Sequence, residues 1–137
     1  MTALGDEVRA ILGGRAFAHL ATLLPGGAPH SVPVWVGVRP DDRLVVFTQS
    51  GSRKARNIER DCRVALSAVD LDDPYRQCDL RGQVVERIDG EAALVIADEL
   101  ARKYTGRAFP GRSPATVVYV IAPERVHHVK LPFTHEA

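Results

Sequence analysis

Alternating apolar and polar positions run through most of the chain, and helical spacing of apolar residues occurs in three short stretches. Leu4, Val8, Ile11 and Leu12 share one helical face, and Gly13-Gly14 ends that helix. The pattern predicts helices over 4–12, 53–60 and 91–104. It predicts strands over 15–24, 28–38, 44–48, 63–71, 75–88 and 116–130, with turns such as Pro25-Gly26-Gly27 between them.

The predicted strand over 28–38 has the clearest alternation. Its valines fall on one face, which we expect to be buried: Val32, Val34, Val36 and Val38. The opposite face carries Ser31, Pro33, Trp35 and Gly37. Pro33 favours an edge strand or a bulge, because proline cannot donate to the ladder. Gly82 predicts a bulge in the strand over 75–88, and we expect the last strand to bend near Pro123.

The order of these elements predicts the fold class. Strands and helices do not alternate regularly, so a parallel βαβ fold is excluded. We expect a mainly β, α+β fold: an antiparallel sheet or barrel with three helices packed outside it. Repeats, low-complexity tracts and linkers are absent from the sequence, which predicts a single domain over residues 1–137.

Composition excludes several function classes. The formal net charge of +1 gives no reason to expect nucleic acid or a membrane surface as a partner. The N-terminus lacks a signal-peptide pattern. The two cysteines, Cys62 and Cys78, form no CxxC pair and have no metal-type spacing, so we expect free thiols and a cytoplasmic protein. His127 and His128 are adjacent on a predicted strand and point to opposite faces, which argues against a shared metal ion.

The segment over 44–64 carries the strongest chemical signal. A strand ends at Phe47-Thr48, a Gly/Ser turn follows, and Ser52 is a natural N-cap for a helix that begins with Arg53-Lys54. Free backbone amides at a helix start, two hydroxyls and two cations together favour an anion such as phosphate. Read from residues alone, a solvated basic helix, with Arg56 and Arg60 near the same face, is the alternative.

The same segment resembles the pyridoxamine 5′-phosphate oxidase-like superfamily. The resemblance rests on Phe47-Thr48, on the run from Gly51 to Ala55, on Asn57-Ile58 and on the run from Asp61 to Leu66. It extends over nearly the whole chain, including Ser31 to Trp35 and Tyr75-Arg76-Gln77. It implies a split β-barrel of the FMN-binding type that works as a homodimer, with the cofactor at the subunit interface.

The resemblance also implies cofactor-binding residues. In such proteins the Thr and the Ser-Arg-Lys turn hold the cofactor phosphate, the second strand lines the ring, and a glutamine contacts its polar edge. The corresponding residues here are Val32, Pro33, Val34, Trp35, Phe47, Thr48, Ser52, Arg53, Lys54, Asn57 and Gln77. The runs 102–107 and 123–128 resemble the branch that uses the deazaflavin coenzyme F420. The carboxyl end, including His135, does not match the tryptophan and arginine that serve vitamin B6 oxidation, so that activity is not assigned.

These features favour an F420-dependent oxidoreductase that transfers a hydride to a small conjugated organic substrate. The alternatives are an FMN-dependent enzyme on the same fold and a non-catalytic F420 carrier. The simplest alternative is a β-barrel interaction domain that binds no cofactor. Hydride chemistry belongs to the cofactor, so the catalytic residue is left unassigned; Tyr75 and His30 are candidates for protonating a substrate. Arg56, Arg60, Lys103, Arg107 and Arg112 could add charge for a cofactor tail.

Overall fold

Seven strands form one sheet in the computed structural model, which describes residues 1–134. Every strand pair is antiparallel, in the order β2-β1-β5-β6-β7-β4-β3. The strands are β1 (Ala18–Leu23), β2 (Pro29–Val34), β3 (Gly37–Val38), β4 (Leu44–Gln49), β5 (Arg63–Val69), β6 (Arg76–Ile88) and β7 (Thr116–Lys130). The helices are α1 (Asp6–Gly13), α2 (Arg53–Arg60) and α3 (Gly90–Thr105).

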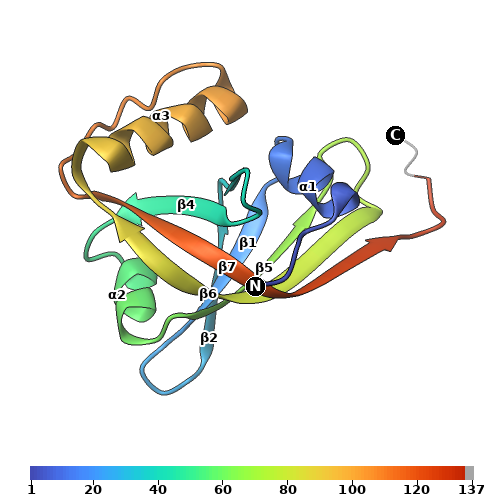
Figure 1. Cartoon of the computed structure of the whole chain (residues 1–137), viewed down its shortest axis with the longest axis horizontal. Coiled ribbons are helices and arrows are strands. Elements are labelled where there is room, and N and C mark those ends of the chain that lie inside the picture. Colours follow the sequence, from blue (N-terminus) through green and yellow to red (C-terminus); the bar gives the residue numbers. More distant parts are fainter. Residues whose placement is uncertain (135–137) are drawn as a thin grey trace.

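The sheet curls into a half-barrel with the helices around it (Figure 1). The long strands β6 and β7 cross the middle of the molecule, α3 lies over β4, and α2 follows the carboxyl end of β4 on the side away from α3. The predicted fold class, an antiparallel split β-barrel with three peripheral helices, is therefore confirmed. The single-domain prediction over 1–137 includes residues 135–137, which lie outside the described part of the chain, and it stays a prediction.

The expectation of one strand over 28–38 is wrong. The chain is β2 as far as Val34 and pairs with β1, but it leaves that ladder at Trp35-Val36 and pairs with β4 as β3. Local alternation could not show the break, because it depends on which neighbour each half finds. The valine face is buried only in part: Val34 and Val36 are buried, whereas Val32 and Val38 are half-buried. Gly37, expected on the open face, is buried.

The two faces of the β4–β7 region are both buried, which explains the continuous apolar run from Val117 to Ala122. Alternate residues of β7 point into the half-barrel, where they pack with α1: Val117, Tyr119 and Ile121. The residues between them, Val118 and Val120, pack with Ala93 and Leu100 of α3 on the outer face. Burial of both faces favours continuous β-branched runs over alternation.

Gly82 forms the predicted bulge on β6, and this prediction is confirmed. The register shifts between Arg81 and Gly82, and Gly82 pairs with Pro123 of β7. A Cβ at residue 82 would lie 2.3 Å from the carbonyl oxygen of Ala122, so the backbones approach too closely for any other residue.

Candidate functional site

The turn between β4 and α2 carries the residues that the sequence singled out. Ser52 is extended and caps α2, with its Oγ accepting a hydrogen bond from the backbone N–H of Ala55 at 3.2 Å. Thr48 Oγ1 lies 3.0 Å from the same Ser52 Oγ. Gly51 permits this path because it adopts a φ of +84°. Two hydroxyls therefore lie beside the free amides of the first helical turn.

The first turn of α2 has cations and no acidic residue. Arg53 is exposed and Lys54 is half-buried. Within residues 1–134, neither side chain has a hydrogen-bond or ion-pair partner. The helix dipole adds positive potential at the same end. This electrostatic arrangement is unfavourable by itself, and an anion bound at this turn would relieve it.

α2 is anchored to β1 by a buried amide. Asn57 is 0% exposed, and its Nδ2 donates to Thr22 Oγ1 of β1 at 3.0 Å. Its Oδ1 accepts from Arg60 Nη2 at 3.1 Å, and Arg60 also donates to the carbonyl of Leu23. Asn57, predicted to contact the cofactor, therefore lies in the contact between α2 and β1, where it holds the helix in place.

The other side of α2 is anchored through Glu59. Its carboxylate accepts from Tyr119 Oη of β7 at 2.8 Å and from Arg87 Nη1 of β6 at 2.8 Å. These two hydrogen bonds lower the pKa of Glu59. Burial, together with the hydrogen bond to Glu59, raises the pKa of Tyr119. The helix is thus fixed between β1 and the β6–β7 pair, so its first turn has a defined position.

Trp35 lies at the β2–β3 break within a chain of aromatic contacts. Its ring stacks on Tyr104 of α3, with centroids 5.3 Å apart and an interplanar angle of 7°. Its edge meets Phe47 of β4 at 6.1 Å, and Phe47 in turn meets Phe109 at 5.0 Å. Phe17 lies 5.6 Å from Tyr104. Such packing holds Trp35 in one orientation.

The end of α3 also fixes the backbone beside Trp35. Tyr104 Oη accepts from the N–H of Val36 at 3.2 Å and donates to the carbonyl of Ala16 at 2.6 Å. Lys103 Nζ donates to the carbonyl of Val36 at 2.6 Å and to that of Leu12 at 2.8 Å. Val36 belongs to no strand, and α3 supplies the partners that a ladder would have provided.

One cavity brings the aromatic residues and the basic turn together. It has a volume of about 340 Å³ and is lined by Phe17, Pro33, Val34, Trp35, Phe47 and Lys54. Its walls are apolar and aromatic, and Lys54 supplies the single charged side chain among these lining residues. An apolar cleft with few polar groups is the usual form of a small-molecule site, and this volume is at the small end of that range. We call it the Trp35 cavity.

Five of the predicted site residues line the Trp35 cavity: Pro33, Val34, Trp35, Phe47 and Lys54. Thr48 and Ser52 are joined to its rim through the α2 turn, and Arg53 is exposed on the same turn. Val32 packs against the core. Gln77 lines a separate hollow of about 260 Å³ on the outer face of β1, β5 and β6, which shares only Phe17 with the Trp35 cavity.

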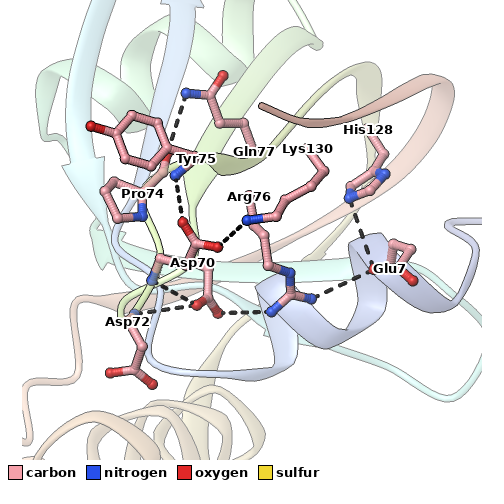
Figure 2. A network of polar contacts seen from close by, with 10 residues as sticks. Glu7, Asp70, Asp72, Pro74, Tyr75, Arg76, Gln77, His128 and Lys130 are labelled. Atoms are coloured by element: carbon pink, nitrogen blue, oxygen red, sulfur yellow. Dashed lines mark hydrogen bonds and ion pairs between the residues drawn. The ribbon is translucent and has the colours of Figure 1, made fainter. Parts of the chain in front are cut away.

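The loop that precedes Gln77 is held by a polar network (Figure 2). Asp70 Oδ2 accepts from the backbone N–H of Asp72 at 3.2 Å, and Arg76 lies between Asp70 and Glu7 of α1, 3.5 and 3.6 Å away. Gln77 Nε2 donates to the carbonyl of Pro74 at 3.2 Å. The glutamine thus has a defined position at the start of β6.

Several expected charges have local partners. Lys103 donates to the carbonyl of Val36 beside Trp35, and Arg60 donates to Asn57. Arg112 forms an ion pair with Asp98 at 2.5 Å. Arg56 and Arg107 are exposed. Within residues 1–134, no group of three metal-ligating side chains gathers. No helix in that range is long and apolar enough to cross a membrane.

Sequence reasoning missed the part of the site that tertiary contacts build. Lys103 and Tyr104 read as the polar and apolar positions of an ordinary amphipathic helix, and nothing in their spacing points to Val36. Phe17 could have been predicted from the hairpin that the sequence indicated. Its register pairs Ala18 with Val34, which places Phe17 next to Trp35.

The comparisons with known proteins agree with this fold. A solved structure described as an F420 reductase is 26% identical, with a TM-score of 0.78, and covers 87% of this chain and 94% of its own. A conserved hypothetical protein from Mycobacterium tuberculosis is 24% identical, with a TM-score of 0.77, 100% and 92% of the two chains being covered. A pyridoxamine 5′-phosphate oxidase-related, FMN-binding protein from Nostoc punctiforme PCC 73102 is 20% identical, with a TM-score of 0.66 and coverages of 85% and 74%.

No curated protein matches the sequence significantly. The model of the pyridoxamine 5′-phosphate oxidase family matches residues 4–130, nearly the whole chain. This confirms the resemblance noted in the Ser-Arg-Lys segment. The chain therefore belongs to the pyridoxamine 5′-phosphate oxidase family.

Proposed function

We propose that this chain is an oxidoreductase that binds coenzyme F420 in the Trp35 cavity and transfers a hydride between it and a small conjugated organic substrate. The observation that carries the proposal is the shared lining of this cavity: an aromatic wall from Trp35 and Phe47 and the ammonium of Lys54 from the α2 turn. A flavin-type cofactor needs an apolar surface for its flat ring and a cation for its phosphate, and these residues supply both. The likeness to an F420 reductase supports the choice of cofactor.

Each residue has a definite task in this proposal. Thr48, Ser52 and the first amides of α2 donate to the phosphate, and Arg53 and Lys54 neutralise it. Trp35 and Phe47 cover the ring and exclude water. The cofactor supplies the hydride, so no side-chain nucleophile is required. Protonation of a substrate by Tyr75 or His30 stays a prediction. Neither residue lines this cavity.

A homodimer would complete the site. The Trp35 cavity is small, and Gln77 lies outside it on the outer sheet face. A hollow on that face is lined by the small side chains of Ala21, Ala65 and Ser67 together with His19, Asp79 and Arg81. We propose that a second copy packs there and that Gln77 of one subunit reaches the cofactor of the other. A cytoplasmic location is part of the same proposal.

Two alternatives keep specific support. The Ser-Arg-Lys turn recognises phosphate, so it serves FMN as well as F420, and a relative of the same fold is described as FMN-binding. A non-catalytic F420 carrier is the other, because the residues lining the Trp35 cavity include no carboxylate or imidazole.

Fluorescence titration of the purified protein with F420 and, separately, FMN tests the proposal. The double variant R53Q/K54Q removes two charge-assisted contacts and should weaken F420 binding by about 100-fold. R102Q, which removes one exposed positive charge from α3, is the control for loss of charge outside the α2 turn and should bind as the parent does.

Turnover is then measured with reduced F420 and a panel of enones, quinones and biliverdin-like acceptors. Tight F420 binding without turnover on any acceptor supports the carrier, and a yellow FMN-loaded protein supports the flavin enzyme. Absence of binding to either cofactor, or equal binding by R53Q/K54Q, contradicts the proposed site.

A further inference from the structure

A second cavity lies next to the Trp35 cavity along β4. It has a volume of about 500 Å³ between α1, the β3 segment and α3. Val45 lines it, whereas Phe47, two residues further on the same strand face, lines the Trp35 cavity. Part of its wall is apolar, from Val38, Val45, Ile96 and Leu100, and charged residues from α1, the β3 segment and α3 complete it. A cavity of this size and polarity is large enough for a small molecule.

Lys103 is the polar group that sets this cavity apart. The ammonium has three N–H donors, and two of them are used by the carbonyls of Leu12 and Val36. Its Nζ also lies 4.8 Å from the centroid of the Tyr104 ring. Within residues 1–134, no carboxylate lies within ion-pair distance of it. Burial without an opposing charge lowers the pKa of Lys103 to about 8.

The other charged residues around the cavity leave this ammonium uncompensated. Arg9 of α1 is paired with Asp42, and Arg39 lies 3.4 Å from Asp41 and 3.6 Å from Glu86. Glu99 precedes Lys103 by four residues on α3, a spacing at which such pairs usually form, but it is exposed and the lysine turns inward instead. Lys103, with two of its three N–H donors used, thus lines a partly apolar cavity without an ion-pair partner in the described part of the chain.

We propose that this cavity is a second ligand site, which binds a small monocarboxylate with an apolar body, its carboxylate on Nζ of Lys103. The carboxylate supplies the acceptor and the charge that Lys103 lacks, and the apolar body covers Ile96 and Leu100. A neutral ligand would leave the ammonium as poorly solvated as before, and a large anion such as a nucleotide would need more basic groups than the cavity offers free.

Binding of a ligand at this site can be measured by the intrinsic fluorescence of Trp35. Lys103 binds the carbonyl of Val36, the residue next to Trp35, and the neighbouring Tyr104 stacks on the indole ring. Trp35 is the one tryptophan in the sequence, so intrinsic emission reports on this region alone. A ligand that draws on the Lys103 ammonium should change that emission.

Octanoate is the probe, and octanol, with the same chain length and no charge, is its control. We expect a saturable change in Trp35 emission with octanoate, weakened about tenfold or more in K103M, which loses a charge-assisted contact. R102Q, on the same helix with the same loss of charge, should bind octanoate as the parent does. Equal affinity in K103M, an equal response to octanol, or no saturable response overturns the proposal.

Two further measurements guard against misfolding of K103M. I96F leaves the ammonium in place and fills the cavity, so it should also lose octanoate binding. The sequence has three lysines, Lys54, Lys103 and Lys130, so ¹³C-labelled side chains can be resolved and titrated by NMR. Octanoate should raise the pKa of Lys103; an unchanged pKa contradicts the assignment. The titration of Lys103 by NMR does not depend on Trp35 emission, so it stays readable whether or not the Trp35 cavity holds a flavin or deazaflavin.

Discussion

The helices α2 and α3 hold the Trp35 cavity from two sides in different ways. α2 is strongly basic, and polar side chains attach it to the sheet: Asn57 to Thr22, and Glu59 to Tyr119 and Arg87. α3 is twice as long, packs through Ala93 and Leu100 against β4 and β7, and adds polar contacts at its end through Lys103 and Tyr104.

The two helices differ in whether their contribution to the site is encoded locally or by distant residues. The phosphate-type turn of α2 is a local structure, in which cap, glycine and cations lie within four consecutive residues. On α3, Lys103 and Tyr104 hold the backbone of Val36, and we call these contacts the clamp. The paired residues lie 67 and 68 positions apart in the sequence, so the clamp has no local signature. A local motif acquires function only when non-local contacts fix its position, and each helix can be tested for how much those contacts contribute.

The largest effect is expected from N57A, which removes the buried anchor of α2. The substitution leaves Thr22, 1% exposed, without its donor and opens a small cavity, so the free energy of unfolding should fall by about 2–3 kcal/mol. Urea unfolding followed by circular dichroism measures it. R56A, an exposed neighbour on the same helix, is the matched control and should change stability by less than about 0.5 kcal/mol. A loss no larger than that of R56A would mean that the anchor is dispensable.

A smaller loss is expected from Y104F, which breaks the clamp of α3 and keeps the ring that stacks on Trp35. Without the hydroxyl, the N–H of Val36 and the carbonyl of Ala16 lose their partner, which should cost about 1–2 kcal/mol. Urea unfolding measures the loss, and a shift in Trp35 emission should accompany it because Val36 is its neighbour. The idea of a clamp fails if both stability and emission match those of the parent.

The two helices also show how far the sequence alone could lead. Ser52 and the limits of α2 follow from local chemistry, and both were predicted correctly. Asn57 was predicted to bind the cofactor and Lys103 was named as a possible charge for a cofactor tail. Their contacts with Thr22 and with the carbonyl of Val36 had no signal in the sequence, because those partners lie 35 and 67 positions away. The strand break at Trp35-Val36 escaped prediction for the same reason. Alternation predicts which face is buried, but it does not predict which strand pairs with it.

The smallest effect on stability is expected from S52A, at the start of α2. Loss of the N-cap typically costs about 1 kcal/mol, less than the loss of the buried Asn57 anchor, because the N–H of Ala55 that Ser52 caps lies at the start of the helix, close to water. Urea unfolding again provides the measurement. A loss as large as that of N57A would show that α2 depends on its own cap more than on its anchors.

S52D separates the cap from the proposed ligand contact at the same position. Aspartate is as good an N-cap as serine, and its charge suits the helix dipole, so stability should stay close to that of the parent. The same charge would repel a phosphate from the amides of the first turn, so F420 and FMN binding should be lost in S52D and only weakened in S52A. If S52D binds either cofactor as the parent does, the phosphate does not lie at the start of α2, and the cations Arg53 and Lys54 need another explanation.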